Sequence, residues 1–345
     1  MTGSDGTPPA GPRGLPILAD GHGRIHRDLR ISLTDHCNLR CTYCMPAEGV
    51  PYLPRFTLLT TSELLRVVEI AVGAGITEVR LTGGEPLLRP DIVEIVAGIA
   101  ALEGPHGRPE VSMTTNGTGL ARIAGRLADA GLNRVNISLD TLRPERFKAM
   151  TRRDQFEHTL DGIAAAAAAG LRPVKINAVL LRGVNDDEAS ELVTWAREQG
   201  HEMRFIEQMP LDAGHTWTRE GMVTADEVQA RLAEAFELTA VPGRGAAPAE
   251  RFLIDGGPDV VGIIASVTRP FCGACDRLRL TADGQLRSCL FARTESDLRT
   301  PLRAGASVEE LTGIIHQNLA SKLPGHGINE PGFLQPPRPM SAIGG

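Results

Sequence analysis

Three cysteines in one short segment constrain the fold of this chain more than any other feature. Cys37, Cys41 and Cys44 have the spacing C-x3-C-x2-C, and they directly follow an apolar alternation at residues 29–33 that predicts a strand. A loop with this spacing can fold around one inorganic core with all three sulfurs pointing inward, as closely spaced thiolates do around iron–sulfur cubes. Because three protein ligands are one too few for a four-iron cube, one iron would stay open to bind a ligand or a substrate.

A structural zinc loop is the simpler alternative for this segment. Zinc loops ordinarily use C-x2-C pairs with a fourth Cys or His at a fixed distance. The only nearby candidate is His36, which is adjacent to Cys37 and therefore badly placed to close a tetrahedron. The spacing favours an iron–sulfur cluster over zinc, and three neighbouring buried cysteines without a metal are the remaining alternative.

Size and charge limit the class of protein. The 345 residues are enough for one large domain and a smaller one. A net charge of -6 provides no general attraction for nucleic acid or for a membrane, so any polyanion has to be bound by a local cluster of cations. No apolar run approaches the ~20 residues of a membrane-spanning helix, and residues 1–16 lack the basic and apolar regions of a signal peptide. We therefore expect a cytoplasmic protein that binds neither nucleic acid nor membranes, in a compartment where cysteines serve metals or catalysis.

Strand-like and helix-like segments alternate from Arg30 onward, which predicts a parallel α/β sheet. The expected strands are 29–33, 78–81, 110–114, 134–138, 174–179 and 202–206. The expected helices are 61–72, 91–101, 120–130, 159–169 and 188–199, and glycines at 75, 131, 170 and 200 stop four of them. Alternation does not distinguish a doubly wound sheet from an open or closed barrel, but in both folds functional residues gather at the C-terminal ends of the strands.

Three of these strand ends carry small and polar residues. They are residues 82–86 (Thr-Gly-Gly-Glu-Pro), 114–117 (Thr-Thr-Asn-Gly) and 138–140 (Ser-Leu-Asp). Ordinary turn chemistry explains the last two segments as well as a binding role does. For Gly83 and Gly84 a second reason applies, because a backbone without Cβ atoms can come close to a ligand.

Four strands of the predicted sheet each carry an isolated cation. A single charge in an apolar strand is costly unless it has a partner or faces a cavity. Separate salt bridges would explain each cation singly, but their repetition around one sheet favours a shared anionic ligand such as a triphosphate. The four residues are Arg30, Arg80, Lys175 and Arg204.

A second cysteine triplet follows in the last third of the chain. Cys272, Cys275 and Cys289 have the spacing C-x2-C-x13-C, again without an obvious fourth ligand, since the nearest downstream His is His316. Taken alone, this triplet fits zinc or an iron–sulfur cluster equally well. If residues 277–279 are extended, the arginines at both ends of that segment share one face. Before the triplet we expect a helix at 224–236, a link rich in Gly, Ala and Pro at 241–250, and a strand at 260–267.

The first triplet, with Tyr43 directly before its third cysteine, resembles the signature of the radical S-adenosylmethionine (SAM) superfamily. The resemblance implies that Cys37, Cys41 and Cys44 ligate a 4Fe-4S cluster whose open iron chelates the amino and carboxylate groups of SAM. It also implies an incomplete (β/α)6 parallel barrel, followed by a smaller C-terminal domain that carries a second 4Fe-4S cluster. The residues that it places against SAM are Tyr43, Gly84, Ser138 and Met209.

The second triplet, the neighbouring Arg277 and Arg279 and the ending Gly344-Gly345 together resemble the GTP 3',8-cyclase family over residues 24–345. Members carry out the first step of molybdenum cofactor biosynthesis. The resemblance implies that a 5'-deoxyadenosyl radical takes the hydrogen at ribose C3' of GTP, that the resulting carbon radical attacks C8, and that the product is (8S)-3',8-cyclo-7,8-dihydroguanosine 5'-triphosphate.

The same resemblance assigns roles to individual residues. The second cluster, on Cys272, Cys275 and Cys289, would anchor the guanine through its open iron. The implied GTP contacts are Arg30, Arg80, Thr114, Lys175, Arg204, Arg277 and Arg279. The implied catalytic residues are Arg30, Arg277, Arg279, Gly344 and Gly345, the last two because only residues without side chains enter a narrow gap in the active site.

From these features we expect four regions and several partners. The regions are a disordered segment 1–23, the radical SAM domain 24–209, a cluster- and GTP-binding domain 210–330, and a tail 331–345 that enters the active site. The partners implied by the resemblance are the substrate GTP, an external one-electron donor, a cyclic pyranopterin monophosphate synthase that receives the product, and a second copy of the chain in a homodimer.

One departure and two alternatives stand beside this hypothesis. Glu78 occupies a position where related sequences often have Lys, so one triphosphate contact implied by the resemblance is either missing or supplied by another residue. Another radical SAM enzyme with an auxiliary cluster, such as a peptide-modifying maturase, would share the first loop but would not need Arg277, Arg279 or the Gly-Gly ending. A zinc-stabilised, non-catalytic nucleotide-binding protein would explain the cysteines, but not why each triplet lacks a ligand.

Overall fold

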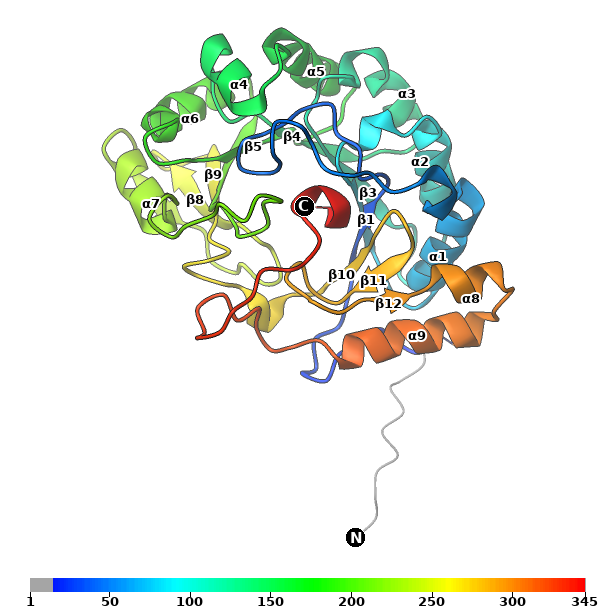
Figure 1. The fold of residues 1–345 in the computed structure, drawn as a ribbon. Coiled ribbons are helices and arrows are strands. Elements are labelled where there is room, and N and C mark those ends of the chain that lie inside the picture. The colour runs from blue at the N-terminus through cyan, green and yellow to red at the C-terminus, as the bar shows by residue number, and fades with distance from the viewer. Residues whose placement is uncertain (1–14, 345) are drawn as a thin grey trace.

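The computed structural model describes residues 15–344, and one sheet of twelve strands forms its centre (Figure 1). The strand order is β12-β11-β10-β1-β2-β3-β4-β5-β6-β9-β8-β7. The strands are β1 Asp28–Ser32, β2 Glu78–Thr82, β3 Glu110–Thr115, β4 Arg134–Ser138, β5 Lys175–Val179, β6 Glu202–Ile206, β7 Leu238–Ala240, β8 Glu250–Ile254, β9 Val260–Ile264, β10 Arg277–Leu280, β11 Gln285–Arg287 and β12 Ser296–Asp297. The six strands expected from the sequence are β1 to β6.

The eight strands from β10 to β9 run parallel, and two antiparallel strands extend each end of the sheet. The sheet curves, and helices α1 to α7 follow its outer side, while the C-terminal helix α10 lies inside the curve (Figure 1). Among the described strands β7 and β12 do not pair with each other, so the sheet is open. The helices are α1 Thr61–Gly73, α2 Ile92–Ala100, α3 Ala124–Asp129, α4 Pro144–Thr151, α5 Phe156–Ala168, α6 Ala189–Glu198, α7 Ala225–Ala233, α8 Arg299–Arg303, α9 Val308–Ala320 and α10 Met340–Ile343.

The alternation within each parallel strand separates an apolar face from a polar one. In β1, Leu29 and Ile31 belong to the main apolar core, and Arg30 lies on the opposite face. The same pattern repeats along the sheet, where the second and fourth residues of β2 and β4 are fully buried aliphatic side chains. The polar face is therefore the inner one, and it is lined by charged and hydroxyl side chains.

Local sequence signals set the ends of several helices. Thr60 begins α1 with a capping box that includes Glu63, and Thr224 begins α7 in the same way. The four glycines expected to stop helices, at 75, 131, 170 and 200, all have positive φ. Helices α4, α8, α9 and α10 were not expected, although α9 begins with a capping box of Ser307 and Glu310 that the sequence contains.

Disorder was predicted for residues 1–23, and this prediction is wrong for residues 15–23. Leu18 is fully buried in the core, and its backbone pairs with His26. Asp20 forms a buried ion pair with Arg24, with 2.6 Å between Oδ2 and Nε. The sequence there is rich in Gly and Pro, but contacts with the body of the protein outweigh that composition. Residues 1–14 lie outside the described residues.

The C-terminal part of the chain does not build a sheet of its own within residues 210–344. It adds β10 beside β1 at one end of the parallel strands and β9 beside β6 at the other. A second, smaller apolar core joins this part to the tail. Its buried members are Leu211, Met222, Val267, Phe291, Ile328 and Ile343. The C-terminal domain therefore completes the inner face rather than standing beside it.

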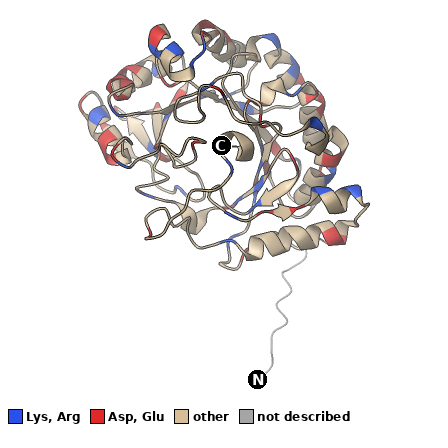
Figure 2. Cartoon of the chain, in the orientation of Figure 1, with Lys and Arg blue, Asp and Glu red and all other residues tan. Residues whose placement is uncertain are grey.

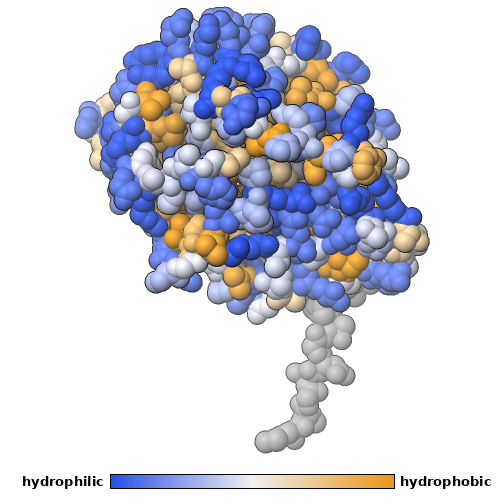
Figure 3. Space-filling model, viewed as in Figure 1, coloured by the Kyte–Doolittle hydropathy of each residue, from blue (hydrophilic) through white to orange (hydrophobic). Residues whose placement is uncertain are grey.

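The surface has a mixed character. The face seen in Figure 3 is mostly hydrophilic, with apolar side chains in separate groups. Across residues 15–344, we find no helix that is both long and apolar enough to cross a membrane.

Candidate active site

The first cysteine triplet lies in the loop after β1, and two arginines hold the backbone of that loop. Arg40 donates from its guanidinium to the carbonyl of Cys37 over 2.6 Å. Arg152 donates to the carbonyls of Arg40 and Met45 over 3.0 and 2.9 Å, so that it spans the segment containing the other two cysteines. Arg152 has a φ of 55°, a left-handed conformation that is strained for a residue with a side chain. The end of α4 thus fixes the shape of the loop.

A cavity of about 170 Å³ opens beside these three cysteines. It brings together most of the residues predicted to contact SAM, and it includes two residues of the C-terminal helix α10. Its functionally relevant lining consists of Cys37, Cys41, Tyr43, Cys44, Gly84, Thr114, Asn116, Ser138, Asp140, Met340 and Ser341. Thr114, predicted to contact GTP, therefore lies at the same cavity as the predicted SAM residues.

The surroundings of the three thiols suit a positively charged inorganic group. Burial raises the pKa of Cys37 to about 11 and that of Cys44 to about 12, and it raises the pKa of Cys41 well above its usual value. A thiol must lose its proton to bind metal, so the charge of the bound group itself has to stabilise these thiolates. All six cysteines of the chain are free. Within residues 15–344, no group of three His, Cys, Asp or Glu side chains is arranged to hold a single metal ion.

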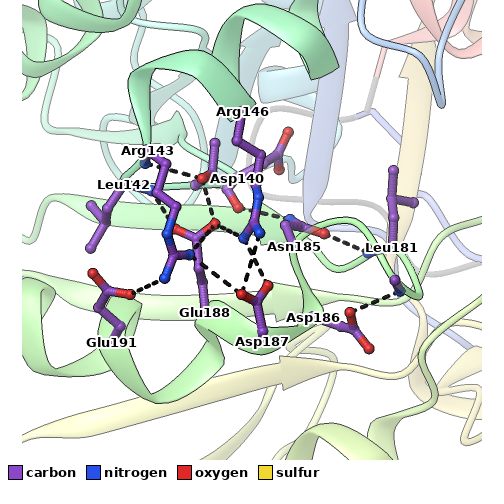
Figure 4. A network of polar contacts seen from close by, with 12 residues as sticks. Asp140, Leu142, Arg143, Arg146, Leu181, Asn185, Asp186, Asp187, Glu188 and Glu191 are labelled. Carbon is purple, nitrogen blue, oxygen red and sulfur yellow. Dashed lines mark hydrogen bonds and ion pairs between the residues drawn. The ribbon is translucent and has the colours of Figure 1, made fainter.

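Tyr43 is fixed by a carboxylate at the end of β4. Its hydroxyl donates to Asp140 Oδ2 over 2.7 Å, while Asp140 Oδ1 accepts from the backbone N–H of Val179 in β5. Burial raises the pKa of Asp140 to about 6. Figure 4 shows the outer part of this network, in which Asn185 donates to the backbone carbonyl of Asp140 and the buried Glu188 accepts from two arginines of the α4 segment. The cysteine loop is therefore tied to the strand ends through Tyr43.

The two glycines after β2 are required by contact within the chain. A Cβ on Gly84 would lie 2.2 Å from the carbonyl oxygen of His36, and a Cβ on Gly83 would lie 2.4 Å from that of Thr34. Gly84 N–H donates to Thr34 over 2.7 Å. The close approach that was expected toward a ligand is thus, in this structure, an approach to the start of the cysteine loop, and Gly84 lines the cavity as well.

Sequence reasoning missed two polar residues beside this cavity. Glu85 is buried and accepts from Thr115 Oγ1 and from the backbone N–H of Asn116 over 2.6 and 2.7 Å. Burial raises its pKa to about 7. Asn116 Nδ2 lies 4.0 Å from Cys37 Sγ. Both residues belong to strand-end segments that the sequence had singled out, but only their burial and mutual contacts separate them from ordinary turn residues.

Four of the predicted GTP contacts gather around one carboxylate on the inner face. Arg30 is in register with Arg80 on one side and with Arg279 on the other, and Asp28 is in register with Arg277. Asp28 Oδ2 lies 3.5 Å from Arg30 Nε and 3.4 Å from Arg277 Nε. Burial lowers the pKa of both Arg30 and Arg279 to about 9. One carboxylate does not balance four arginines, so this part of the face favours an anion.

Lys175 and Arg204 extend this group of cations along β5 and β6. Both share Glu202, which lies 4.0 Å from Lys175 Nζ and 2.7 Å from the Arg204 guanidinium. Burial, together with the nearby Arg204, lowers the pKa of Lys175 to about 8. Figure 2 shows Lys and Arg on strands around the C-terminal helix. Glu78, which stands where related sequences often have Lys, lies at the same end of the face. It pairs with Arg134 over 3.3 Å, so this position carries a negative charge that partly neutralises a neighbouring cation.

The second cysteine triplet borders a cavity of about 70 Å³ together with Arg277 and Arg279. One guanidinium nitrogen of Arg277 lies 3.7 Å from Cys275 Sγ, and the guanidinium carbon lies 4.9 Å from the centre of the Phe271 ring. The strand β10 places both arginines on one face, as expected. Met209, predicted to contact SAM, lines this cavity and a small neighbouring one beside Tyr43 and Cys44, but not the larger first cavity.

Two further residues at the second triplet were missed. Lys322 is buried and donates to the backbone carbonyls of Cys275 and Arg277 over 3.1 and 2.8 Å, and its Nζ lies 3.7 Å from Cys275 Sγ. The same Nζ lies 2.8 Å from His26 Nε2. His326, not His316, lines the cavity, and its ring contacts the carbonyl of Ser266. These residues lie far from the triplet in sequence, so spacing alone could not indicate them.

The tail connects the two cysteine sites. Arg279 donates to the carbonyl oxygen of Gly344, and the backbone N–H of Ser341 faces the thiol of Cys44. Gly344 has a φ of 74°, and a Cβ there would lie 2.2 Å from Thr82 Oγ1 and 2.7 Å from Ser32 Oγ. Only glycine fits at this position. Gly345 lies outside the described residues.

Comparison with known proteins agrees with this arrangement. Residues 31–196 match the Radical SAM superfamily, and residues 201–328 match the family Molybdenum Cofactor Synthesis C. The crystal structure of SuiB from Streptococcus suis resembles 86% of this chain and 69% of its own, with a TM-score of 0.57 and 14% sequence identity, a likeness that concerns the fold alone. Fold and site together define a radical SAM enzyme.

Full-length relatives narrow the class. GTP 3',8-cyclase of Streptomyces coelicolor is 59% identical over 96% of this chain and 97% of its own length. GTP 3',8-cyclase of Corynebacterium glutamicum is 55% identical over 98% and 91%, and GTP 3',8-cyclase 2 of Mycobacterium tuberculosis is 53% identical over 97% and 95%. The chain belongs to the GTP 3',8-cyclase family.

Proposed function

We propose that this enzyme converts GTP to (8S)-3',8-cyclo-7,8-dihydroguanosine 5'-triphosphate, the first step of molybdenum cofactor biosynthesis. The observation that carries the proposal is the inner face of the sheet, where six cations lie between two cysteine triplets. They are Arg30, Arg80, Lys175, Arg204, Arg277 and Arg279. A triphosphate is an anion of sufficient charge to compensate them. A peptide-modifying maturase would not require this face, and a zinc-stabilised nucleotide-binding protein would not explain why each cysteine triplet lacks a fourth ligand.

At the first cavity, Cys37, Cys41 and Cys44 would hold a 4Fe-4S cluster, and Tyr43, Gly84, Ser138 and Met209 would position SAM. When bound and reduced, the cluster supplies the electron that splits SAM into methionine and a 5'-deoxyadenosyl radical. The residues present fit this group, because three free thiols line one cavity. Asp140 keeps Tyr43 in place, and the tail helix covers the cavity with Met340 and Ser341.

At the second cavity, Cys272, Cys275 and Cys289 would hold another 4Fe-4S cluster and present it to the guanine. Lys322 and Arg277 favour anionic sulfur there, since they lower the pKa of Cys275 although burial alone would raise it. Arg277 and Arg279 lie between that cavity and Arg30, so they can orient the nucleotide. Thr114 would contact the sugar side of GTP at the SAM cavity.

The proposal includes partners that supply or consume what this chain does not hold. An external one-electron donor has to reduce the first cluster, and a cyclic pyranopterin monophosphate synthase receives the cyclic triphosphate. A cytoplasmic location suits six free thiols. The expectation of a homodimer rests on the family resemblance alone.

The test is anaerobic purification with iron and sulfide analysis, followed by incubation of the reduced protein with SAM, with and without GTP. We expect two four-iron clusters and a cyclised GTP product formed together with 5'-deoxyadenosine. Cys37→Ser should stop SAM cleavage, whereas Cys272→Ser should retain the first cluster and lose the cyclised product. Zinc in place of iron would end the radical proposal, and SAM cleavage independent of GTP would refute the substrate.

A further inference from the structure

A stiff segment leads into the C-terminal helix. Residues 335–339 read Gln-Pro-Pro-Arg-Pro and directly precede α10. Proline fixes its own φ and restricts the residue before it to extended conformations, so three prolines in five residues leave this segment little freedom. The tail runs from the end of α9 to the inside of the curved sheet (Figure 1). Because the segment is stiff, contacts that hold it in place also fix the position of the helix that follows it.

Side chains of this segment attach it to the body of the protein at two places, and directly after it the Met340 N–H donates to the Leu211 carbonyl over 2.9 Å. Gln335 Nε2 donates to the backbone carbonyl of Asp212 over 2.7 Å. Arg338 donates with both terminal nitrogens to the two carboxylate oxygens of Asp283, over 2.9 and 2.8 Å, and its Nε lies 3.0 Å from Glu295 Oε1. Asp212 follows β6, whereas Asp283 lies in the turn between β10 and β11. The segment therefore spans the open side of the curved sheet.

The acceptors of Arg338 are themselves held in place. Asp283 accepts from Thr281 Oγ1 over 2.6 Å, and Glu295 also pairs with Arg287, whose side chain has no exposed surface. The side chain of Arg338 is only 24% exposed, and that of Asp283 is 9% exposed. Isolated exposed ion pairs contribute little to stability, but a bidentate arginine within a fixed, partly buried network contributes more.

We propose that Arg338 is a positioning residue that holds α10 across the two cysteine sites. With Arg338 in place, the N–H of Ser341 faces Cys44 and the carbonyl of Gly344 reaches Arg279. Ile343 packs in the second apolar core and the Met340 N–H donates to the Leu211 carbonyl, so these contacts hold the tail on the side of β6, whereas Arg338 ties it to the turn between β10 and β11. This role of Arg338 rests on the proposed function wherever it concerns GTP cyclisation, whereas the attachment of α10 by Arg338 can be measured without it.

The first arm of the experiment measures hydrogen–deuterium exchange in the full chain without substrate. The variants are Arg338→Lys, Arg338→Gln and Arg338→Glu. The matched control is Arg197→Gln, because Arg197 also bridges two aspartates, Asp255 and Asp259, but at the far edge of the sheet. The backbone N–H groups of Ala342 and Gly344 report on α10, because they donate to the carbonyls of Pro339 and Met340, and the N–H of Met340 reports on the attachment of the helix to the Leu211 carbonyl. We expect exchange at these groups to rise about tenfold in Arg338→Gln, more in Arg338→Glu, and less in Arg338→Lys.

The second arm measures GTP-dependent formation of 5'-deoxyadenosine and iron content in the same variants. We expect kcat to fall in the order Lys, Gln, Glu, with the iron content of both sites unchanged, and the control to behave like the unaltered protein. Unchanged exchange at α10 in Arg338→Glu would overturn the anchor. Faster exchange with full activity would overturn its importance for the reaction. If the unaltered protein does not cyclise GTP, the proposed function fails, and the exchange result still decides the anchor.

Discussion

The hydroxyl of Tyr43 donates a hydrogen bond to the carboxylate of Asp140 over 2.7 Å, and this contact joins two segments nearly a hundred residues apart. Tyr43 belongs to the loop of the first cysteine triplet, and Asp140 follows the end of β4. Because Asp140 also accepts from the backbone of Val179, the loop is tied to two neighbouring strands of the sheet. The shape of the first cavity depends on this link.

Asp140→Ala should loosen the cysteine loop. It leaves the Tyr43 hydroxyl and the Val179 N–H without their acceptor, at a cost of about 1–3 kcal/mol in the free energy of unfolding. SAM affinity should fall with it. Denaturant unfolding and equilibrium SAM binding measure the two effects. Asp140→Asn keeps one acceptor for the Val179 N–H and presents an amide NH2 to the Tyr43 hydroxyl, which can then accept instead of donating, so it should lose less than Asp140→Ala. An equal loss in both variants would contradict this account.

Lys175 should make GTP binding depend on pH. Its pKa, lowered to about 8 by burial and by Arg204, means that it is charged below that pH and neutral above it. GTP binding is therefore strongest below the pKa of the free enzyme and weakens above it, by up to about tenfold per pH unit until the pKa of the bound enzyme is passed. Equilibrium binding between about pH 7 and about pH 9 tests this dependence. Lys175→Arg should flatten the profile, because arginine stays charged over this pH range. An identical profile in Lys175→Arg would show that another group causes the pH dependence.

Glu78→Gln should strengthen GTP binding. Glu78 pairs with Arg134 at the edge of the cation group, and its pKa is raised by burial and then by Asp28. Arg134 keeps its ion pair with Glu110, but removing the charge of Glu78 leaves it only one carboxylate partner and removes a repulsion of the triphosphate, which we expect to lower the Kd for GTP about three- to tenfold. Glu69→Gln, which removes an ion pair with Arg66 on the outer side of α1, is the control. A Kd that stays the same or rises would show that Glu78 does not face the phosphates.

Gly344→Ala should displace the tail. The added Cβ would meet Thr82 Oγ1 at 2.2 Å, and the positive φ disfavours any side chain. A displacement of about 1 Å at a reacting centre can cost about 100-fold in rate, so kcat for GTP cyclisation should fall by at least that order. Gly305→Ala shares the backbone strain, with a φ of 80°, but its Cβ meets no atom within 4 Å. Comparable losses in both variants would attribute the effect to backbone strain alone.

Lys322→Met should remove iron from the second site and leave the first site intact. Lys322 joins two backbone carbonyls of the second cysteine loop and lies beside Cys275 Sγ, whereas it makes no hydrogen bond to the described part of the first loop. Electron paramagnetic resonance of the reduced protein resolves the two clusters. A full complement of both clusters in this variant would reduce Lys322 to a packing residue.

The sequence predicted β1 to β6 and both cysteine triplets because these depend on local periodicity and spacing. The parallel pairing of β10 with β1 could not be predicted, since it joins segments about 250 residues apart and no local pattern specifies that neighbour. The sequence placed Arg277 and Arg279 next to the second triplet because they are its neighbours along the chain. It could not show that Arg277 shares Asp28 with Arg30, since that contact depends on the pairing of β10 with β1. The disorder expected for residues 15–23 was wrong because composition does not report the burial of Leu18.

The most direct test of the central claim is the fate of one hydrogen atom. GTP deuterated at C3' is incubated anaerobically with SAM and the reduced, cluster-loaded protein, and the 5'-deoxyadenosine is analysed by mass spectrometry. The account predicts that deuterium appears in 5'-deoxyadenosine in step with the cyclised triphosphate. 5'-Deoxyadenosine that forms without deuterium, or equally well without GTP, would contradict it.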